Sequence, residues 1–207
     1  MSENKQDLEK GLNQRHNKRM EKKKAVIDKR IAKADREKGL LLILTGNGKG
    51  KSSSAFGMIA RALGHVMKVG VVQFIKGRTD TGEEAYFSKD PNVDWQVMGE
   101  GFTWDTQDRE QDVKAAEKGW LEAKRMMSDP SYDLLIFDEF TYILKYKYLD
   151  EDTVMADIKS RPEMQHVVIT GRAASDALRD AADTISEIAD VKHAYRAGIK
   201  AQKGVDL

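Results

Sequence analysis

A glycine-rich segment contains the residues of this sequence best suited to chemistry. In order they are Thr45, Gly46, Asn47, Gly48, Lys49, Gly50, Lys51 and Ser52, called the phosphate loop below. Glycines let backbone N–H groups turn toward anionic oxygens, and a helix that begins here adds partial positive charge. Lys51 adds a full positive charge, and the Ser52 hydroxyl is a magnesium ligand. We therefore predict that the loop binds ATP, with Ser53 as a further contact; an ordinary strand-to-helix turn would explain the glycines but not the Gly-Lys-Ser ending.

The spacing of the phosphate loop departs from the usual pattern. In G-x-x-x-x-G-K-[ST] the first glycine would fall on Thr45, and a loop counted from Gly46 is one residue short. A changed loop can hold a triphosphate differently from a kinase or a GTPase. Transfer of the γ-phosphoryl group therefore does not follow from this motif.

Three more charged residues follow apolar runs. Asp138 and Glu139 close the run 134–137, a position where an acidic pair commonly faces a phosphate loop. We predict that both hold magnesium, directly or through water, with Glu139 making the inner contact. An acidic strand end or a helix cap is the alternative. Arg172 follows the run 166–170 and is predicted to clamp phosphate oxygens at the carboxyl edge of a sheet, with an ordinary surface arginine as the alternative.

Alternating strands and helices must position these residues. Continuous apolar runs predict buried strands at 40–44, 69–74, 134–137 and 166–170. Apolar residues at steps of three and four predict helices at 52–64 and 113–127. Strands that alternate with helices imply right-handed crossovers, so we predict an α/β fold with a mainly parallel sheet flanked by helices.

The first 38 residues differ in charge from the rest. They hold 13 Lys and Arg against 7 Asp and Glu, so this segment is +6 and residues 39–207 are −5. We predict a basic helical N-terminal arm at 1–38 and an ATP-binding domain at 39–207. The arm has too few apolar residues to bury itself. A basic arm can bind nucleic acid through phosphates, but mixed charges favour a solvated helix, so we expect no nucleic-acid partner.

Composition also excludes several classes of protein. No apolar run approaches the roughly 20 residues that cross a bilayer, and the first residues do not resemble a secretory signal, so we expect a cytoplasmic protein without a membrane partner. The chain has no cysteine, which excludes disulfides, iron–sulfur ligation and thiol redox chemistry. His16, His65, His166 and His193 lack metal-ligand spacing.

Seven segments together resemble one family, the P-loop ATP:corrinoid adenosyltransferases, also called cob(I)yrinic acid a,c-diamide or cob(I)alamin adenosyltransferases. They are T-G-N-G-K-G-K-S at 45–52, V-G-V-V-Q-F-I-K-G at 69–77, G-E-G-F-T-W at 99–104, D-E-F-T-Y at 138–142, V-I-T-G-R at 168–172, A-D-T-I-S-E at 182–187 and K-H-A-Y-R-A-G-I-K-A-Q-K-G-V-D at 192–206. The phosphate loop alone is unspecific, whereas its combination with G-F-T-W and the C-terminal stretch is specific.

The resemblance implies a RecA-like fold that holds ATP in reversed polarity. The Co(I) centre of a reduced corrinoid such as cobalamin then attacks C5′ of ATP and expels triphosphate, in adenosylcobalamin biosynthesis or salvage. Lys51, magnesium or manganese, and the loop amides are suited to stabilise the departing triphosphate. Phe102 and Trp104, which by pattern alone are predicted to be core aromatics, are implied to exclude the lower axial ligand of the corrin, which makes Co(II) easier to reduce.

The resemblance also implies partners. They are a second copy of the chain in a homodimer and an external electron donor such as flavodoxin, and the N-terminal arm is implied to fold over the corrinoid. A RecA-like ATPase or small-molecule kinase remains an alternative, which would release phosphate or ADP. A nucleic-acid-associated ATP switch is a second alternative, which would turn over ATP without a corrinoid.

Overall fold

A computed structural model of the protein describes residues 3–75, 81–98 and 108–206, with side chains from residue 9 onward. The chain divides into two compact units, Met1–Glu37 and Lys38–Leu207. The first unit contains one long helix, and the second contains the sheet and the phosphate loop.

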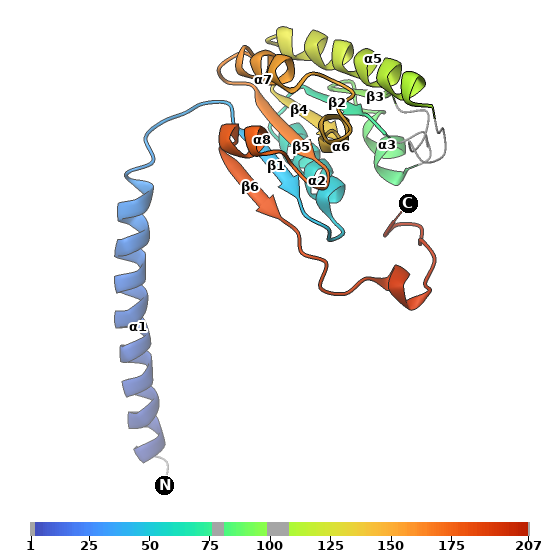
Figure 1. Cartoon of the computed structure of the whole chain (residues 1–207). Coiled ribbons are helices and arrows are strands. Elements are labelled where there is room, and N and C mark those ends of the chain that lie inside the picture. Colours follow the sequence, from blue (N-terminus) through green and yellow to red (C-terminus); the bar gives the residue numbers. More distant parts are fainter. Residues whose placement is uncertain (1–2, 76–80, 99–107, 207) are drawn as a thin grey trace. The chain divides into compact units, whose positions relative to one another are not determined.

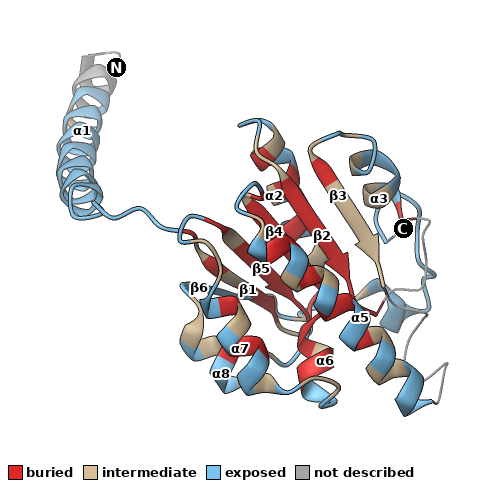
Figure 2. Ribbon diagram, turned by 90° about the horizontal axis from the view of Figure 1, so that it is seen from above, coloured by how far each residue is buried: buried red, intermediate tan, exposed pale blue. Residues whose placement is uncertain are grey.

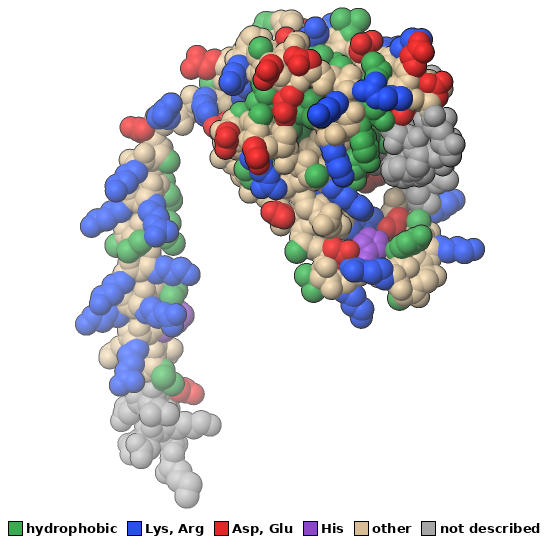
Figure 3. Space-filling model, in the orientation of Figure 1, with side chains coloured by type: hydrophobic (Ala, Val, Ile, Leu, Met, Phe, Trp, Pro, Cys, Tyr) green, Lys and Arg blue, Asp and Glu red, His purple; other side chains and the backbone are tan. Residues whose placement is uncertain are grey.

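The first unit is the helix α1, Glu3–Ile31. Its described side chains are exposed almost throughout, including the apolar Leu12, Met20, Ile27 and Ile31. Basic side chains follow its length (Figure 3). An ion pair between Lys24 and Asp28, 2.7 Å apart and one turn along the helix, gives a small local stabilisation. The predicted basic helical arm is therefore a helix that buries almost none of its own surface.

The second unit is built on a six-stranded sheet in which all pairings are parallel (Figure 1). Its strands are β1 Leu41–Thr45, β2 Val69–Gln73, β3 Val93–Val97, β4 Leu134–Asp138, β5 His166–Thr170 and β6 Thr184–Glu187. Their spatial order is β3-β2-β4-β5-β1-β6. Because all strands are parallel, their carboxyl ends share one edge of the sheet, where open α/β folds bind ligands.

Helices cover both faces of the sheet. The helices of the second unit are α2 Lys51–Leu63, α3 Gly82–Phe87, α5 Arg109–Ser128, α6 Thr141–Lys145, α7 Glu151–Lys159 and α8 Asp176–Ala181, and the 3-10 helix η1 Ala194–Ala197 lies in the exposed C-terminal segment away from the sheet (Figure 1). Alternate residues of a strand point to opposite faces. Ile136 thus packs with Phe56 of α2 in one apolar cluster, and Phe137 packs with Trp120 of α5 in the other. Figure 2 shows the buried strands between these layers.

The predicted α/β fold with a mainly parallel sheet flanked by helices is confirmed, and all four predicted strands are present within one or two residues. The strands β3 and β6 were not predicted. Both lie at the edges of the sheet, and every residue of β6 is exposed, so neither presents a continuous apolar run. Among the described helices, none is long and apolar enough to cross a membrane.

Candidate nucleotide site

The phosphate loop joins the carboxyl end of β1 to the first turn of α2. Gly50 is the N-cap of α2 and has φ 120°, a conformation that glycine adopts without strain. Within the described part of the chain, no side chain caps this helix. Its first N–H groups therefore point outward from a 13-residue helix, which is the arrangement that binds anionic oxygens.

The segment that follows β6 is hydrogen-bonded to the phosphate loop. The amide of Ile188 donates to the Thr45 carbonyl at 2.8 Å, and the amide of Gly48 donates to the Ile188 carbonyl at 2.7 Å. A Cβ atom on Gly48 would lie closer than 3.0 Å to the backbone of Ala189. Gly48 is therefore required by this close approach.

Lys51 lies folded over the loop. Its side chain is buried, and Nζ donates to the Gly48 carbonyl at 2.7 Å. Burial lowers the pKa of Lys51, and the positive charge of Arg172 lowers it further, while Glu139 and Asp138 act in the opposite direction. These predicted site residues are thus near enough to influence one another electrostatically, although they come from three different segments.

The other predicted contacts of the loop differ in accessibility. Thr45 is fully buried, and its hydroxyl has no hydrogen-bond partner among the described residues. Ser52 is half-buried, whereas Asn47 and Ser53 are exposed. Lys49 forms an ion pair with Asp206 at 2.7 Å. Ser52 is therefore more accessible to a ligand than the buried Thr45 side chain.

The acidic pair at the end of β4 is divided between two environments. Asp138 is fully buried and accepts hydrogen bonds from Gln73 Nε2 at 3.0 Å and from Thr170 Oγ1 at 2.7 Å. Glu139 is half-buried and has φ 59°, an uncommon backbone conformation for a residue with a side chain. Its amide donates to Thr170 Oγ1 at 2.9 Å. Sequence reasoning assigned no role to Gln73 or Thr170, although each is a polar residue at the end of an otherwise apolar strand.

Arg172 is exposed but its backbone is fixed. Thr141 Oγ1 donates to the Arg172 carbonyl at 2.6 Å, and a Cβ atom on the neighbouring Gly171, which has φ 138°, would collide with Thr141. Arg172 lies near the site, since it lines one cavity together with Asn47 of the phosphate loop. Its predicted contact with phosphate stays a prediction.

The C-terminal segment, residues 190–206, lies beside the phosphate loop. A cavity of about 670 Å³ is lined by Asn47, Arg172 and residues of this segment, which is a size typical of small-molecule sites. The ion pair of Lys49 with Asp206 joins the segment to the loop, and His193 Nδ1 accepts from the Tyr195 amide at the start of η1. His193 therefore has a local structural role here.

The remaining predictions concern an aromatic pair and metal ligands. Phe102 and Trp104 lie outside the described residues. No group of three or more His, Asp or Glu side chains forms a metal cage within the described ranges. Magnesium, however, is commonly held by one or two carboxylates together with water and substrate phosphates. The oxygen donors of Ser52, Asp138 and Glu139 beside an anion-binding loop fit that pattern.

The chain is similar to known proteins over most of its length. The family described as ATP:corrinoid adenosyltransferase BtuR/CobO/CobP matches residues 37–207, and the one described as cob(I)alamin adenosyltransferase N terminal matches residues 1–31. A corrinoid adenosyltransferase of Pseudomonas aeruginosa is 60% identical over 94% of this chain and 96% of that protein. Those of Escherichia coli K12 and Salmonella typhimurium are each 47% identical over 93% of this chain and 98% of theirs.

Proposed function

Because this chain belongs to the ATP:corrinoid adenosyltransferase family, we propose that it transfers the 5′-deoxyadenosyl group of ATP to the cobalt of a reduced corrinoid and releases triphosphate. The observation that carries the proposal is the family match over residues 37–207, which includes the phosphate loop and the acidic pair. The loop supplies an anion site of the kind that the triphosphate of ATP requires.

The phosphate loop binds ATP through its backbone amides and Lys51. The uncapped first turn of α2, together with Gly46 to Gly50, supports this role, and Ser53 and Arg172 are further proposed contacts. Thr45 contributes through its backbone, because its side chain is buried. ATP fixed in this way is proposed to have C5′ in line with the cobalt nucleophile, an alignment that lowers the barrier to direct substitution.

The reaction forms a cobalt–carbon bond and breaks the bond between C5′ and the α-phosphate oxygen. Co(I) supplies the electron pair of the new bond, and triphosphate leaves with the pair of the old one. No proton has to move in this step, so the site needs no general base. It needs positive charge where negative charge develops on the leaving group, and Lys51 and the loop amides supply it.

Magnesium or manganese is proposed to accompany ATP, held by Ser52 and the acidic pair, with Glu139 making the inner contact. When bound, the ion neutralises charge on the phosphate oxygens. The half-buried positions of Ser52 and Glu139 support their part in this assignment. Asp138, which is buried behind Glu139, contributes negative charge to the same side of the site.

Four parts of the proposal rest on the resemblance alone. Phe102 and Trp104 are proposed to exclude the lower axial ligand of the corrin and thereby to favour reduction of Co(II). A reduced flavoprotein such as flavodoxin supplies the electron. The protein acts as a homodimer, and its N-terminal arm covers the bound corrinoid.

An anaerobic assay with chemically reduced cobalamin, ATP and magnesium tests the proposed reaction. We expect the absorbance spectrum of the alkylated cobalt product to appear at a rate that depends on all three components. ATP should not be consumed when the corrinoid is omitted. Rapid ATP consumption without corrinoid, and no cobalt–carbon product with it, would instead identify an ATPase or a kinase.

A further inference from the structure

Polar side chains on four consecutive strands form a continuous row across the sheet. They are Trp95 on β3, Gln73 on β2, Asp138 on β4 and Thr170 on β5, in the spatial order of those strands. Gln73, Asp138 and Thr170 are the last residues of their strands and are fully buried. Buried polar groups at this density are costly unless they are hydrogen-bonded.

The hydrogen bonds in the first half of the row can run in only one direction, from Trp95 toward Asp138. An indole nitrogen can only donate, so Trp95 Nε1 donates to Gln73 Oε1, at 3.0 Å. The amide nitrogen of Gln73 therefore faces Asp138, and Nε2 donates to Oδ2 at 3.0 Å. The Trp95 ring is itself held against Phe56, with ring centroids 5.0 Å apart. The orientation of the Gln73 amide is thus fixed from both sides.

The second half of the row reaches the backbone of Glu139. A threonine hydroxyl has a single hydrogen, and Thr170 Oγ1 donates it to Asp138 Oδ1 at 2.7 Å. A lone pair of the same oxygen accepts the Glu139 amide at 2.9 Å. Glu139 has φ 59°, which costs backbone energy and requires support from its surroundings. Thr170 supplies that support directly.

We propose that Trp95, Gln73 and Thr170 are positioning residues, which hold the Glu139 turn so that Glu139 faces the divalent cation of ATP. Trp95 and Gln73 act through the buried Asp138 carboxylate, whereas Thr170 contacts the Glu139 amide itself. In this arrangement Asp138 anchors the row and Glu139 is the carboxylate that contacts the ion. The proposal rests on the function proposed above, because it assumes that a cation accompanies ATP beside Lys51 and Ser52.

Two observations separate the tasks of the two carboxylates. Asp138 has no exposed surface and each of its oxygens already accepts a hydrogen bond, whereas Glu139 is only half-buried. Burial and hydrogen bonding therefore favour Glu139 as the carboxylate that contacts the ion. Outer partners of this kind commonly change metal affinity about 10- to 100-fold when removed.

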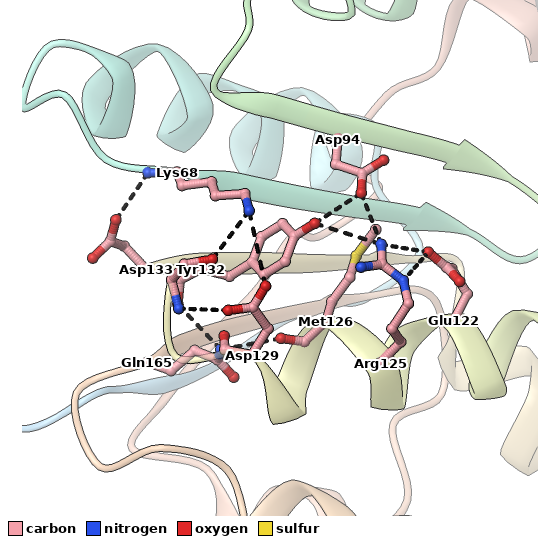
Figure 4. Close-up of polar contacts among 10 residues, drawn as sticks. Lys68, Asp94, Glu122, Arg125, Met126, Asp129, Tyr132, Asp133 and Gln165 are labelled. Atoms are coloured by element: carbon pink, nitrogen blue, oxygen red, sulfur yellow. Dashed lines mark hydrogen bonds and ion pairs between the residues drawn. The ribbon is translucent and has the colours of Figure 1, made fainter.

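A second buried glutamine provides a matched control. Gln165, directly before β5, is 2% exposed, and its Nε2 donates to the carbonyls of Met126, Asp129 and Tyr132 (Figure 4). These contacts lie at the amino edge of the sheet, opposite the phosphate loop. Replacing Gln165 with Met removes a buried amide of the same type and should affect stability without affecting the cation.

The test measures ATP binding by calorimetry in magnesium and in EDTA, without corrinoid, so that the ratio of the two Kd values reports the contribution of the cation. We expect Glu139→Gln to lose most of this ratio and Gln73→Met and Thr170→Val to reduce it about 10-fold or more. Thr170→Ser keeps the hydroxyl and should retain the wild-type ratio. Gln165→Met should also retain it.

Retention of the wild-type ratio in both Gln73→Met and Thr170→Val, with loss in Glu139→Gln, would overturn the positioning role. An unchanged ratio in Glu139→Gln would overturn the assignment of Glu139 to the cation. If Gln73→Met does not fold, the comparison of Thr170→Val with Thr170→Ser decides. Failure of the proposed reaction is a separate outcome, since it would appear as wild-type protein that forms no cobalt–carbon product.

Discussion

Lys51 is held in the site before any ATP arrives, and its buried ammonium is stabilised by the Gly48 carbonyl. Burial lowers its pKa, which means that the folded chain holds the charged form less favourably than water does. Burying a charged ammonium costs free energy of folding, so we expect the Lys51 charge to contribute to ligand binding more than to stability. We therefore expect that Lys51 is not needed for stability but strengthens ATP binding.

The variant Lys51→Met keeps most of the buried side-chain volume and removes the charge. We expect its free energy of unfolding in urea to equal or exceed that of the wild type. Its ATP affinity should fall about 10- to 100-fold, because hydrogen bonds to a charged group are worth about 1.5–3 kcal/mol. A large loss of stability with ATP affinity intact would contradict this view of Lys51.

Two glycines within ten residues of each other should respond oppositely to alanine. In Gly48→Ala the new Cβ meets the Ala189 backbone, which cannot move aside, so we expect a cost of about 1–3 kcal/mol and weaker ATP binding. In Gly57→Ala, inside α2, the new Cβ meets nothing within 4 Å, and the helix should gain about 0.5–1 kcal/mol. Thermal unfolding of both variants measures the difference; equal effects would mean that the loop is not braced by the segment after β6.

Candidate residues for the site could be proposed from the sequence, whereas the contacts between them could not. The Gly-Lys-Ser ending and the acidic pair are local patterns, and the structure brings Lys51, Glu139 and Arg172 close together. Gln73 and Thr170 carry no such pattern, because a single polar residue at the end of an apolar strand is common. Their partnership with Asp138 arises only when β2, β4 and β5 lie side by side.

At the scale of elements, the exposed edge strand β6 supports the site by pairing with β1. Asp183, directly before β6, accepts the Leu41 amide at 2.9 Å and forms an ion pair with Lys38, which joins the start of β1 to β6. The residues after β6 then continue to the phosphate loop through Ile188. The edge strand β6 is therefore fixed to the start of β1 at one end and to the phosphate loop at the other.

Asp183→Asn tests this anchoring through its pH dependence. Burial alone would raise the pKa of Asp183, but hydrogen bonds from Lys38 and the Leu41 amide lower it below its ordinary value. Its contribution to stability is therefore present above about pH 4, the unfolded pKa, and is lost as the pH falls through the lowered folded pKa. At pH 7 we expect the variant to be less stable by about 1 kcal/mol, a value reduced by solvent screening.

Urea unfolding from pH 7 down to the lowest pH at which the wild type stays folded measures this difference. The gap between variant and wild type should close on acidification. The matched variant Asp180→Asn, at an exposed position of α8, should show no comparable gap. A gap that is the same at every pH would mean that Asp183 acts by packing and not by charge.

The elements that sequence could predict are those buried on both faces. The strands β1, β2, β4 and β5 are continuous apolar runs because helices cover both sides of them. In β3, Asp94 and Gln96 alternate with apolar residues, and β6 has no buried residue, so both strands depend on pairing that local sequence does not reveal. The short helices α3 and α6 have five or six residues, too few for a periodic pattern.

At the scale of the whole molecule, three basic residues lie in or near the loop that ends β1, although residues 39–207 are net negative. Lys51 and Arg172 face this region from different elements, and Lys49 flanks it. The cavity beside the C-terminal segment adds space next to the loop. The body therefore combines an anion site with room for more than the phosphates, as a transfer from the sugar carbon of ATP requires.

The most direct test of this account is phosphorus NMR of the products formed from ATP, magnesium and reduced cobalamin under anaerobic conditions. Attack at C5′ predicts intact inorganic triphosphate, formed in equal amount to the cobalt–carbon product. ADP or orthophosphate as the primary product, without cobalt alkylation, would place the reaction at phosphorus and contradict the account.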